Sequence, residues 1–174
     1  AEGVVTHHEW MADSPEDPRR ALAHFIAPIV EDAETLVAYY SPFEEGILNG
    51  LAEFCSPHQA AVLRAGSRRF VDLLPVVRDY VYHPDFQGRF NLKTVVSALL
   101  PSLAYEDLTV KRGDVASLML EEFIVHDTWR DTPSRKEAKK HLLAYCERDT
   151  LTLMRLVEFL RAGIQGQPTP HHQL

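Results

Sequence analysis

The sequence has few cysteines and no long apolar run, and these two absences argue against disulfide-rich, zinc-knuckle and membrane-spanning proteins. Its 174 residues include only two cysteines, Cys55 and Cys146, and no C-x-x-C pair. This argues against a disulfide framework or a zinc knuckle and favours a reducing compartment. No window holds the roughly eighteen apolar residues that a membrane span needs. We therefore expect a cytoplasmic chain without a membrane partner.

Signals of targeting and of several familiar chemistries are also missing. The chain begins Ala1-Glu2-Gly3, without an initiator methionine or the basic and apolar regions of a signal peptide. We therefore expect a piece of a longer protein with other domains. No glycine-rich phosphate loop, nucleophile elbow or catalytic Cys-His motif occurs.

The charge balance excludes one kind of nucleic-acid protein but not another. A net charge of −7 argues against a protein that coats nucleic acid by bulk electrostatics. It does not argue against a nuclease, because a site of several carboxylates is acidic until divalent metals reverse its local sign.

The apolar pattern predicts a few short strands and then many helices. Strands are predicted over 4–11 and 35–40, while 71–74 is ambiguous between strand and helix. Helices are predicted over the following approximate ranges: 18–30, 43–54, 57–70, 91–100, 115–124 and 135–160. This pattern is typical of an α/β domain with an unusually small sheet. We expect one domain over 1–163, a flexible tail over 164–174, and further strands before Ala1.

Two carboxylates and a tyrosine form the candidate catalytic site. Tyr145 precedes Asp149 by four residues on the last predicted helix, so phenol and carboxylate share one face. Glu44 follows a short strand and opens a helix, where carboxylates at sheet ends project into clefts. Phosphodiester cleavage with two metals needs converging carboxylates and a group that orients water, and Mg²⁺ prefers oxygen ligands. Glu44 and Asp149 are therefore candidate metal ligands, and Tyr145 is the candidate water-positioning group.

Each of these three residues also has a purely structural interpretation. Tyr145 can be a buried core residue with an exposed Asp149 beside it. Glu44 can stabilise a helix N-terminus through its charge. Neither motif alone supports a functional claim.

Three further residues are candidates for contact with a nucleic acid. Asp72 follows an apolar pair near the expected cleft and is either a site residue or a cap. Lys93, in the first turn of its helix, is placed to touch a substrate phosphate together with the helix N-terminus. His141 shares a face with Tyr145 and either lines the rim of the cleft or is a solvated histidine.

The order of these segments resembles the tyrosine form of the DEDD superfamily of 3′–5′ exonucleases. Residues 39–48 (Y-Y-S-P-F-E-E-G-I-L) are similar to its second exonuclease motif, and residues 142–153 are similar to its third. The histidine form would place His where Ala144 stands. The resemblance implies a ribonuclease-H-like α/β exonuclease fold with a helix-rich C-terminal part, a Mg²⁺ or Mn²⁺ cofactor, and single-stranded nucleic acid as the substrate.

More narrowly, residues 4–161 resemble the C-terminal part of a bacterial family known only as a domain of unknown function. The likeness is carried by V-D-L-L-P-V-V-R-D-Y-V-Y-H-P-D-F-Q-G-R-F-N-L-K and by L-L-A-Y-C-E-R-D-T-L.

The chain departs from the exonuclease pattern in three places. The first motif, Asp-x-Glu on the opening strand, is absent, which implies a fold truncated at its N-terminal strand or strands. Tyr40 or Ser41 replaces the usual Asn of the second motif, and Glu44 stands where the superfamily mostly has Asp. We therefore expect a metal-dependent exonuclease-like domain that is nearly inactive without an upstream Asp-x-Glu strand. The alternative is a non-catalytic ribonuclease-H-like scaffold that binds nucleic acid or a partner protein.

Overall fold

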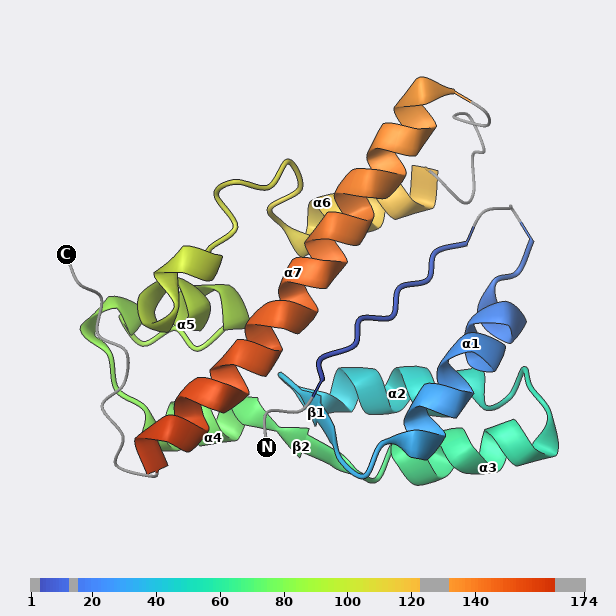
Figure 1. The fold of residues 1–174 in the computed structure, drawn as a ribbon, viewed down its shortest axis with the longest axis horizontal. Coiled ribbons are helices and arrows are strands. Elements are labelled where there is room, and N and C mark those ends of the chain that lie inside the picture. Colours follow the sequence, from blue (N-terminus) through green and yellow to red (C-terminus); the bar gives the residue numbers. More distant parts are fainter. Residues whose placement is uncertain (1–3, 13–15, 123–131, 165–174) are drawn as a thin grey trace.

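A computed structural model describes residues 4–12, 16–122 and 132–164. Its elements follow one another in this order: α1 (Arg19–Asp32), β1 (Leu36–Ala38), α2 (Ser41–Leu51), α3 (Pro57–Gly66), β2 (Phe70–Asp72), α4 (Leu73–Tyr80), the short 3₁₀ helix η1 (Pro84–Phe86), α5 (Leu92–Leu99), a second 3₁₀ helix η2 (Pro101–Leu103), α6 (Gly113–Glu121) and α7 (Pro133–Ile164). In Figure 1, α7 crosses the length of the molecule, with α1, α2 and α3 toward one end and α4 and α5 toward the other. None of the helices described has the length and apolarity to cross a bilayer.

The structure is mainly helical, so the prediction of an α/β ribonuclease-H-like fold is wrong. β1 and β2 pair in parallel as a two-stranded sheet, with Leu36 opposite Phe70 and Ala38 opposite Asp72. The three described ranges contain no further strand and no larger sheet core. Two strands of three residues cannot cover a layer of helices, so the helices pack largely on one another.

The strand predicted over 4–11 is also wrong. These residues belong to no strand, and the side chains of Val4 and Val5 are 92% and 66% exposed. Apolar alternation alone does not make a strand, because the backbone N–H and C=O groups of a strand need a neighbouring strand to pair with. The predicted tail covers 164–174. Ile164 is the last residue of α7 and 165–174 lie outside the described residues, so the division into domain and tail stays a prediction.

The first part of the core lies between α1, α2 and α3. Ser56 and Gln59 form a capping box at the start of α3, which satisfies N–H groups that the first turn leaves unpaired. The Arg69 guanidinium donates to the carbonyls of Val30 and Ala33 at the end of α1. These contacts tie the α3–β2 connection to α1. The buried side chains of this part are Ala23, Ala27, Val30, Leu48, Leu51, Ala52, Ala60 and Leu63.

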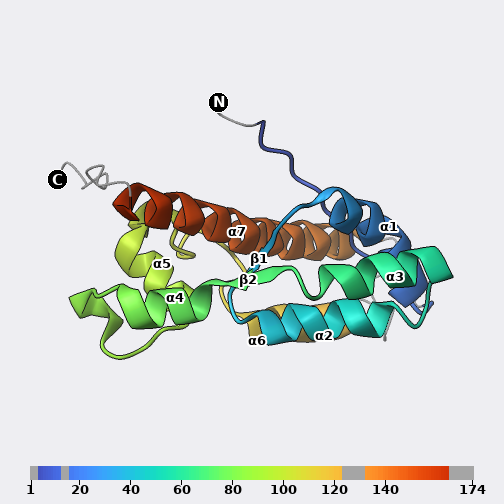
Figure 2. The same ribbon diagram turned by 90° about the horizontal axis from the view of Figure 1, so that it is seen from below.

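The rest of the core surrounds α7. Asn91 caps α5 by accepting from the Thr94 N–H at 3.0 Å, as the sequence predicts. One cluster joins α4, α5 and α7 through Leu73, Val77, Phe86, Val95 and Leu156. A second joins α5, α6 and α7 through Val96, Tyr105, Val110, Ala116, Leu142 and Tyr145. Figure 2 shows α7 along one side of the molecule and α2 along the opposite side.

The ambiguous run 71–74 divides into two elements at Asp72. Phe70–Asp72 forms β2, and α4 begins at Leu73 because the Asp72 side chain accepts from the Leu74 N–H at 2.9 Å. Parallel pairing needs a long crossover, and α2 and α3 supply it between the two strands.

Candidate functional site

The last helix brings two of the predicted site residues together. Tyr145 and Asp149 lie one turn apart on α7, and Tyr145 is 8% exposed within the cluster that joins α5, α6 and α7. Burial raises the pKa of the Tyr145 phenol above its ordinary value, and the charge of Asp149 and a hydrogen bond to it act in the same direction. The phenol therefore stays protonated at neutral pH and donates toward the carboxylate.

Tyr105 is a second phenol at this carboxylate, and sequence analysis missed it. Its hydroxyl donates to Asp149 Oδ1 at 2.6 Å and lies 3.3 Å from Thr152 Oγ1. Burial raises the pKa of Tyr105 above its ordinary value, with the hydrogen bond to Asp149 as the next cause. Tyr105 lies in the irregular connection between η2 and α6, where no periodic pattern marks a residue as inward-facing. No sequence signal therefore distinguishes it.

Lys93 joins the same group from α5. Its Nζ lies 4.7 Å from the centre of the Tyr105 ring and 4.8 Å from the centre of the Tyr145 ring. These are distances at which an ammonium group is attracted to an aromatic face. Burial lowers the pKa of Lys93, while the carboxylates of Asp149 and Asp114 act in the opposite direction. We call Lys93, Tyr105, Tyr145 and Asp149 the phenol–carboxylate cluster.

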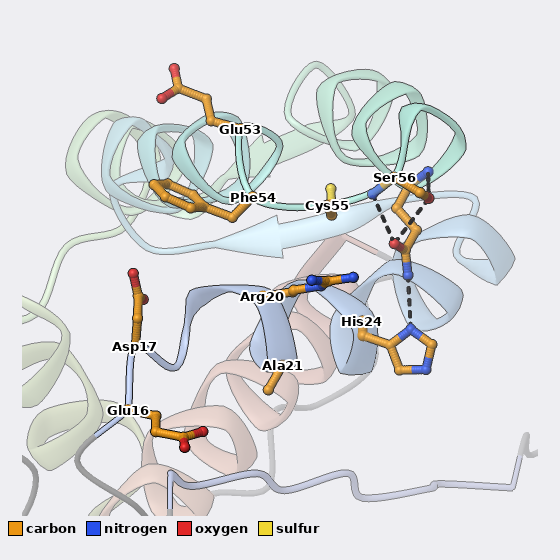
Figure 3. Close-up of a pocket in the computed structure, with 10 residues that line it drawn as sticks. Glu16, Asp17, Arg20, Ala21, His24, Glu53, Phe54, Cys55 and Ser56 are labelled. Carbon is orange, nitrogen blue, oxygen red and sulfur yellow. Dashed lines mark hydrogen bonds between the residues drawn. The ribbon is translucent and has the colours of Figure 1, made fainter.

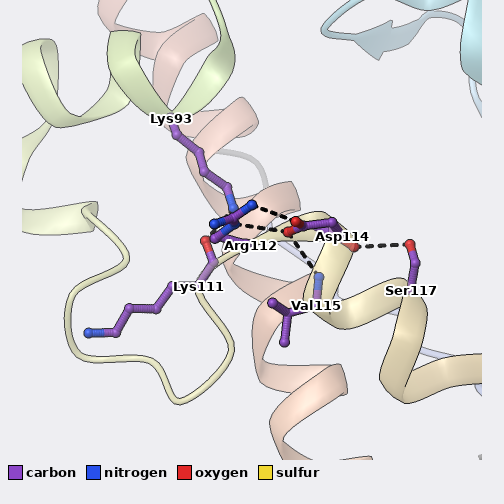
Figure 4. Close-up of polar contacts among 7 residues, drawn as sticks. Lys93, Lys111, Arg112, Asp114, Val115 and Ser117 are labelled. Atoms are coloured by element: carbon purple, nitrogen blue, oxygen red, sulfur yellow. Dashed lines mark hydrogen bonds and ion pairs between the residues drawn. The ribbon is translucent and has the colours of Figure 1, made fainter. Parts of the chain in front are cut away.

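The start of α6 closes one side of this cluster. Lys93 Nζ donates to the Lys111 carbonyl, and Arg112 pairs with Asp114 at 2.5 Å (Figure 4). A Cβ at Gly113 would lie 3.4 Å from the Tyr145 hydroxyl. The segment 111–114 therefore lies directly beside the phenol that sequence analysis assigns to the site.

Glu44 and Asp72 form a separate group at the C-terminal ends of the two strands. Burial raises the pKa of Glu44, and the charges of Asp72 and Glu45 raise it further. Glu44 Oε2 is buried without a hydrogen-bond partner. In the described part of the chain, no hydrogen bond or ion pair joins either residue to Asp149 or Tyr145.

Asp72 makes structural contacts with backbone groups. Its Oδ1 accepts from the N–H groups of Tyr40 and Leu74, each at 2.9 Å, and its Oδ2 accepts from the Ser41 N–H at 3.1 Å. Asp72 therefore holds the starts of α2 and α4 together, which includes the capping role given above as an alternative. His141 is partly exposed on α7 one turn before Tyr145.

The described residues do not by themselves fit a divalent metal. Within the described ranges, no group of three or more His, Cys, Asp or Glu side chains is placed to hold a metal ion. One oxygen of Asp149 already accepts from Tyr105, and an ammonium group lies nearby. A metal at Asp149 would need ligands other than those described, so the Mg²⁺ or Mn²⁺ cofactor stays a prediction.

A hollow of about 810 Å³ lies elsewhere, between α1 and the α2–α3 connection. In Figure 3, Arg20 and His24 face Cys55 and Ser56 across it. His24 Nδ1 is 3.0 Å from Gln59 Nε2, whose side chain also completes the Ser56 capping box. These polar groups serve the local packing of α1 on α3, and no predicted site residue lines this hollow.

The comparisons with known proteins give one match. The model of a family described as a domain of unknown function (DUF2779) matches residues 1–91. The matched segment includes Glu44 and Asp72 and ends just before Lys93, so the whole phenol–carboxylate cluster lies beyond it. No curated protein and no solved structure matches the chain.

Proposed function

The chain belongs to the DUF2779 family, and from that premise we propose that it binds single-stranded nucleic acid at the phenol–carboxylate cluster and cleaves its phosphodiester bonds. The observation that supports this proposal is the convergence of Lys93, Tyr145 and Asp149 on one another. They come from two helices, α5 and α7, and meet around two buried phenols, although about fifty residues of sequence separate Lys93 from Tyr145.

Lys93 is the group that would hold a phosphate. An ammonium has three donors, and one of them is used by the Lys111 carbonyl. Lys93 also lines an open hollow of about 390 Å³ together with Arg89 and Thr94. A phosphate entering from this hollow would meet two cationic side chains, although Asp85 on the same wall weakens the local positive charge.

Asp149 and Tyr145 are the groups that would act on water. The Asp149 oxygen that Tyr105 does not engage can accept a proton from an attacking water, and the oxygen of the Tyr145 phenol, whose proton is directed at Asp149, can orient that water by accepting a hydrogen bond from it. The water oxygen bonds to phosphorus, the P–O bond to the leaving nucleotide breaks, and the leaving oxygen takes a proton from solvent. General base catalysis of this kind contributes about 10²–10⁴-fold to a rate. The likeness of residues 39–48 and 142–153 to the DEDD exonuclease motifs supports the same activity. It also leads us to propose that cleavage runs in the 3′–5′ direction and depends on a metal ion.

The test is degradation of labelled DNA and RNA single strands by the natural full-length protein, with Mn²⁺ and with EDTA. We expect Asp149→Asn to lower the rate about 100-fold or more, since it removes the proton acceptor while keeping the shape of the side chain. Tyr145→Phe is expected to lower the rate about tenfold. Asp79→Asn is the matched control, because Asp79 is an exposed carboxylate that pairs with Arg78. An unchanged rate in Asp149→Asn would refute the site.

A second candidate is a non-catalytic module that binds nucleic acid or a partner protein. It is favoured by the lack of a metal-ligand group among the described residues. Fluorescence anisotropy with a labelled single strand separates the two candidates. Binding that Lys93→Met weakens, with no cleavage by the full-length protein under any metal, supports the module. Cleavage that depends on Asp149 supports the enzyme.

A further inference from the structure

We infer that Tyr105 is a positioning residue, whose hydroxyl holds the Asp149 carboxylate in a fixed orientation through Oδ1. The catalytic consequence rests on the function proposed above. The contact itself is open to an independent test.

The Tyr105 hydroxyl is buried, and its hydrogen-bond partners are Asp149 and Thr152. The side chain is 5% exposed, so water does not compete freely for its proton. Its hydroxyl donates to Asp149 Oδ1 at 2.6 Å, a short distance typical of a hydrogen bond to a charged acceptor. A carboxylate held through one oxygen by a buried donor cannot rotate freely about its last bond. Asp149 is therefore orientated by the protein before any ligand arrives.

A second contact fastens the loop that carries Tyr105. Arg148, the neighbour of Asp149 on α7, donates to the Ala104 carbonyl at 2.6 Å and pairs with Asp107 at 2.7 Å. The side chain of Arg148 is 18% exposed. The loop is therefore clamped to α7 on both sides of Tyr105, and the phenol cannot swing away unless these contacts break.

The contact of Lys93 with the Tyr105 ring does not depend on the Tyr105 hydroxyl. Its ammonium lies over the rings of both Tyr105 and Tyr145. A phenylalanine at position 105 keeps a ring face for this contact and keeps most of the packing in the core. Tyr105→Phe therefore removes the hydroxyl with little other change.

The experiment compares Tyr105→Phe with Tyr82→Phe in the full-length protein. Tyr82 is 88% exposed, so its hydroxyl is solvated. On a labelled single strand we expect Tyr105→Phe to lower kcat per folded molecule by about 10–100-fold, because misplacing a catalytic group is costly. KM stays unchanged, because Tyr105 is not proposed to touch the substrate. Tyr82→Phe changes neither value.

A double-mutant cycle in urea unfolding makes the two proposals separable. We expect Tyr105→Phe and Asp149→Ala, each of which removes one partner of the hydrogen bond, to be coupled by about fivefold or more in the unfolding equilibrium constant, as residues in direct contact are. The same curves give the folded fraction for each variant. An Asp149→Asn protein with full activity refutes the proposed function, and the cycle still decides whether the contact exists. Absence of coupling refutes the inference. So does an unchanged kcat in Tyr105→Phe when Asp149→Asn is inactive.

Discussion

Replacing Asp72 by alanine should destabilise the protein by about 2 kcal/mol, because one carboxylate accepts three backbone N–H groups from two helix starts. The bond to Leu74 caps α4, and losing a cap costs about 1 kcal/mol. The bond to Ser41 is partly buried, and its loss leaves a donor unpaired at a cost of about 1–1.5 kcal/mol. The bond to Tyr40 is exposed, so water replaces most of it.

One contribution to the stability change of Asp72→Ala is favourable, because it releases backbone strain at Tyr40. Tyr40 has a φ of 76°, in the left-handed region, which costs a non-glycine residue about 1–2 kcal/mol. When Asp72 no longer holds Tyr40, part of this strain is released, which keeps the net loss near 2 kcal/mol. For a chain of this size, 1 kcal/mol corresponds to about 2–4 °C in Tm. The expected loss in Tm is therefore about 4–8 °C.

A graded series measures this by urea and thermal unfolding, followed by circular dichroism. Asp72→Asn retains an oxygen acceptor for Tyr40 and Leu74 and should lose only about 1 kcal/mol, roughly half the loss of the alanine variant. Asp79→Ala, a surface control, should stay within about 0.5 kcal/mol. Tyr40→Gly should be more stable than Tyr40→Ala by about 1 kcal/mol, since only glycine adopts this φ without strain.

Two results would refute this reasoning about Asp72. One is an Asp72→Ala protein no less stable than the Asp79→Ala control. The other is a Tyr40→Gly protein less stable than Tyr40→Ala, which would mean that the left-handed conformation at this position is not what the chain adopts.

Three further predictions concern packing and acid sensitivity. Gly66→Ala should lower the free energy of unfolding, measured in urea, by about 1–3 kcal/mol, because a Cβ there would overlap the Val30 side chain of α1. Gly46→Ala should raise it by about 0.5–1 kcal/mol, because no atom lies within 4 Å of a Cβ there and alanine favours the helix. Leu156→Ala should cost about 2–5 kcal/mol by the same assay, since Leu156 is 0% exposed in the core, and a loss under about 1 kcal/mol would contradict its placement. The hydrogen bond from Arg148 lowers the pKa of Asp107, so this pair stabilises the fold above pH about 4 and ceases to do so as the pH falls through the lowered pKa. The stability difference between the natural protein and Asp107→Asn should therefore shrink between pH about 6 and pH about 2.5, and a constant difference would show that the pair does not form.

The sequence alone determined the features that depend on neighbouring residues. The caps at Ser56 and Asn91 and most helices could be predicted from it, because caps and helical periodicity involve residues three or four apart. The placement of Tyr145 beside Asp149 follows from the same spacing on α7.

Only the tertiary structure decided which distant residues meet. It brought Lys93 and Tyr105 to Asp149, and it set Glu44 beside Asp72. It also limited the sheet to two short strands and left residues 4–11 outside it, against the predicted α/β fold. Strand pairing and contacts between elements depend on how whole helix faces pack. That packing is a property of the assembled chain, which short-range patterns do not encode.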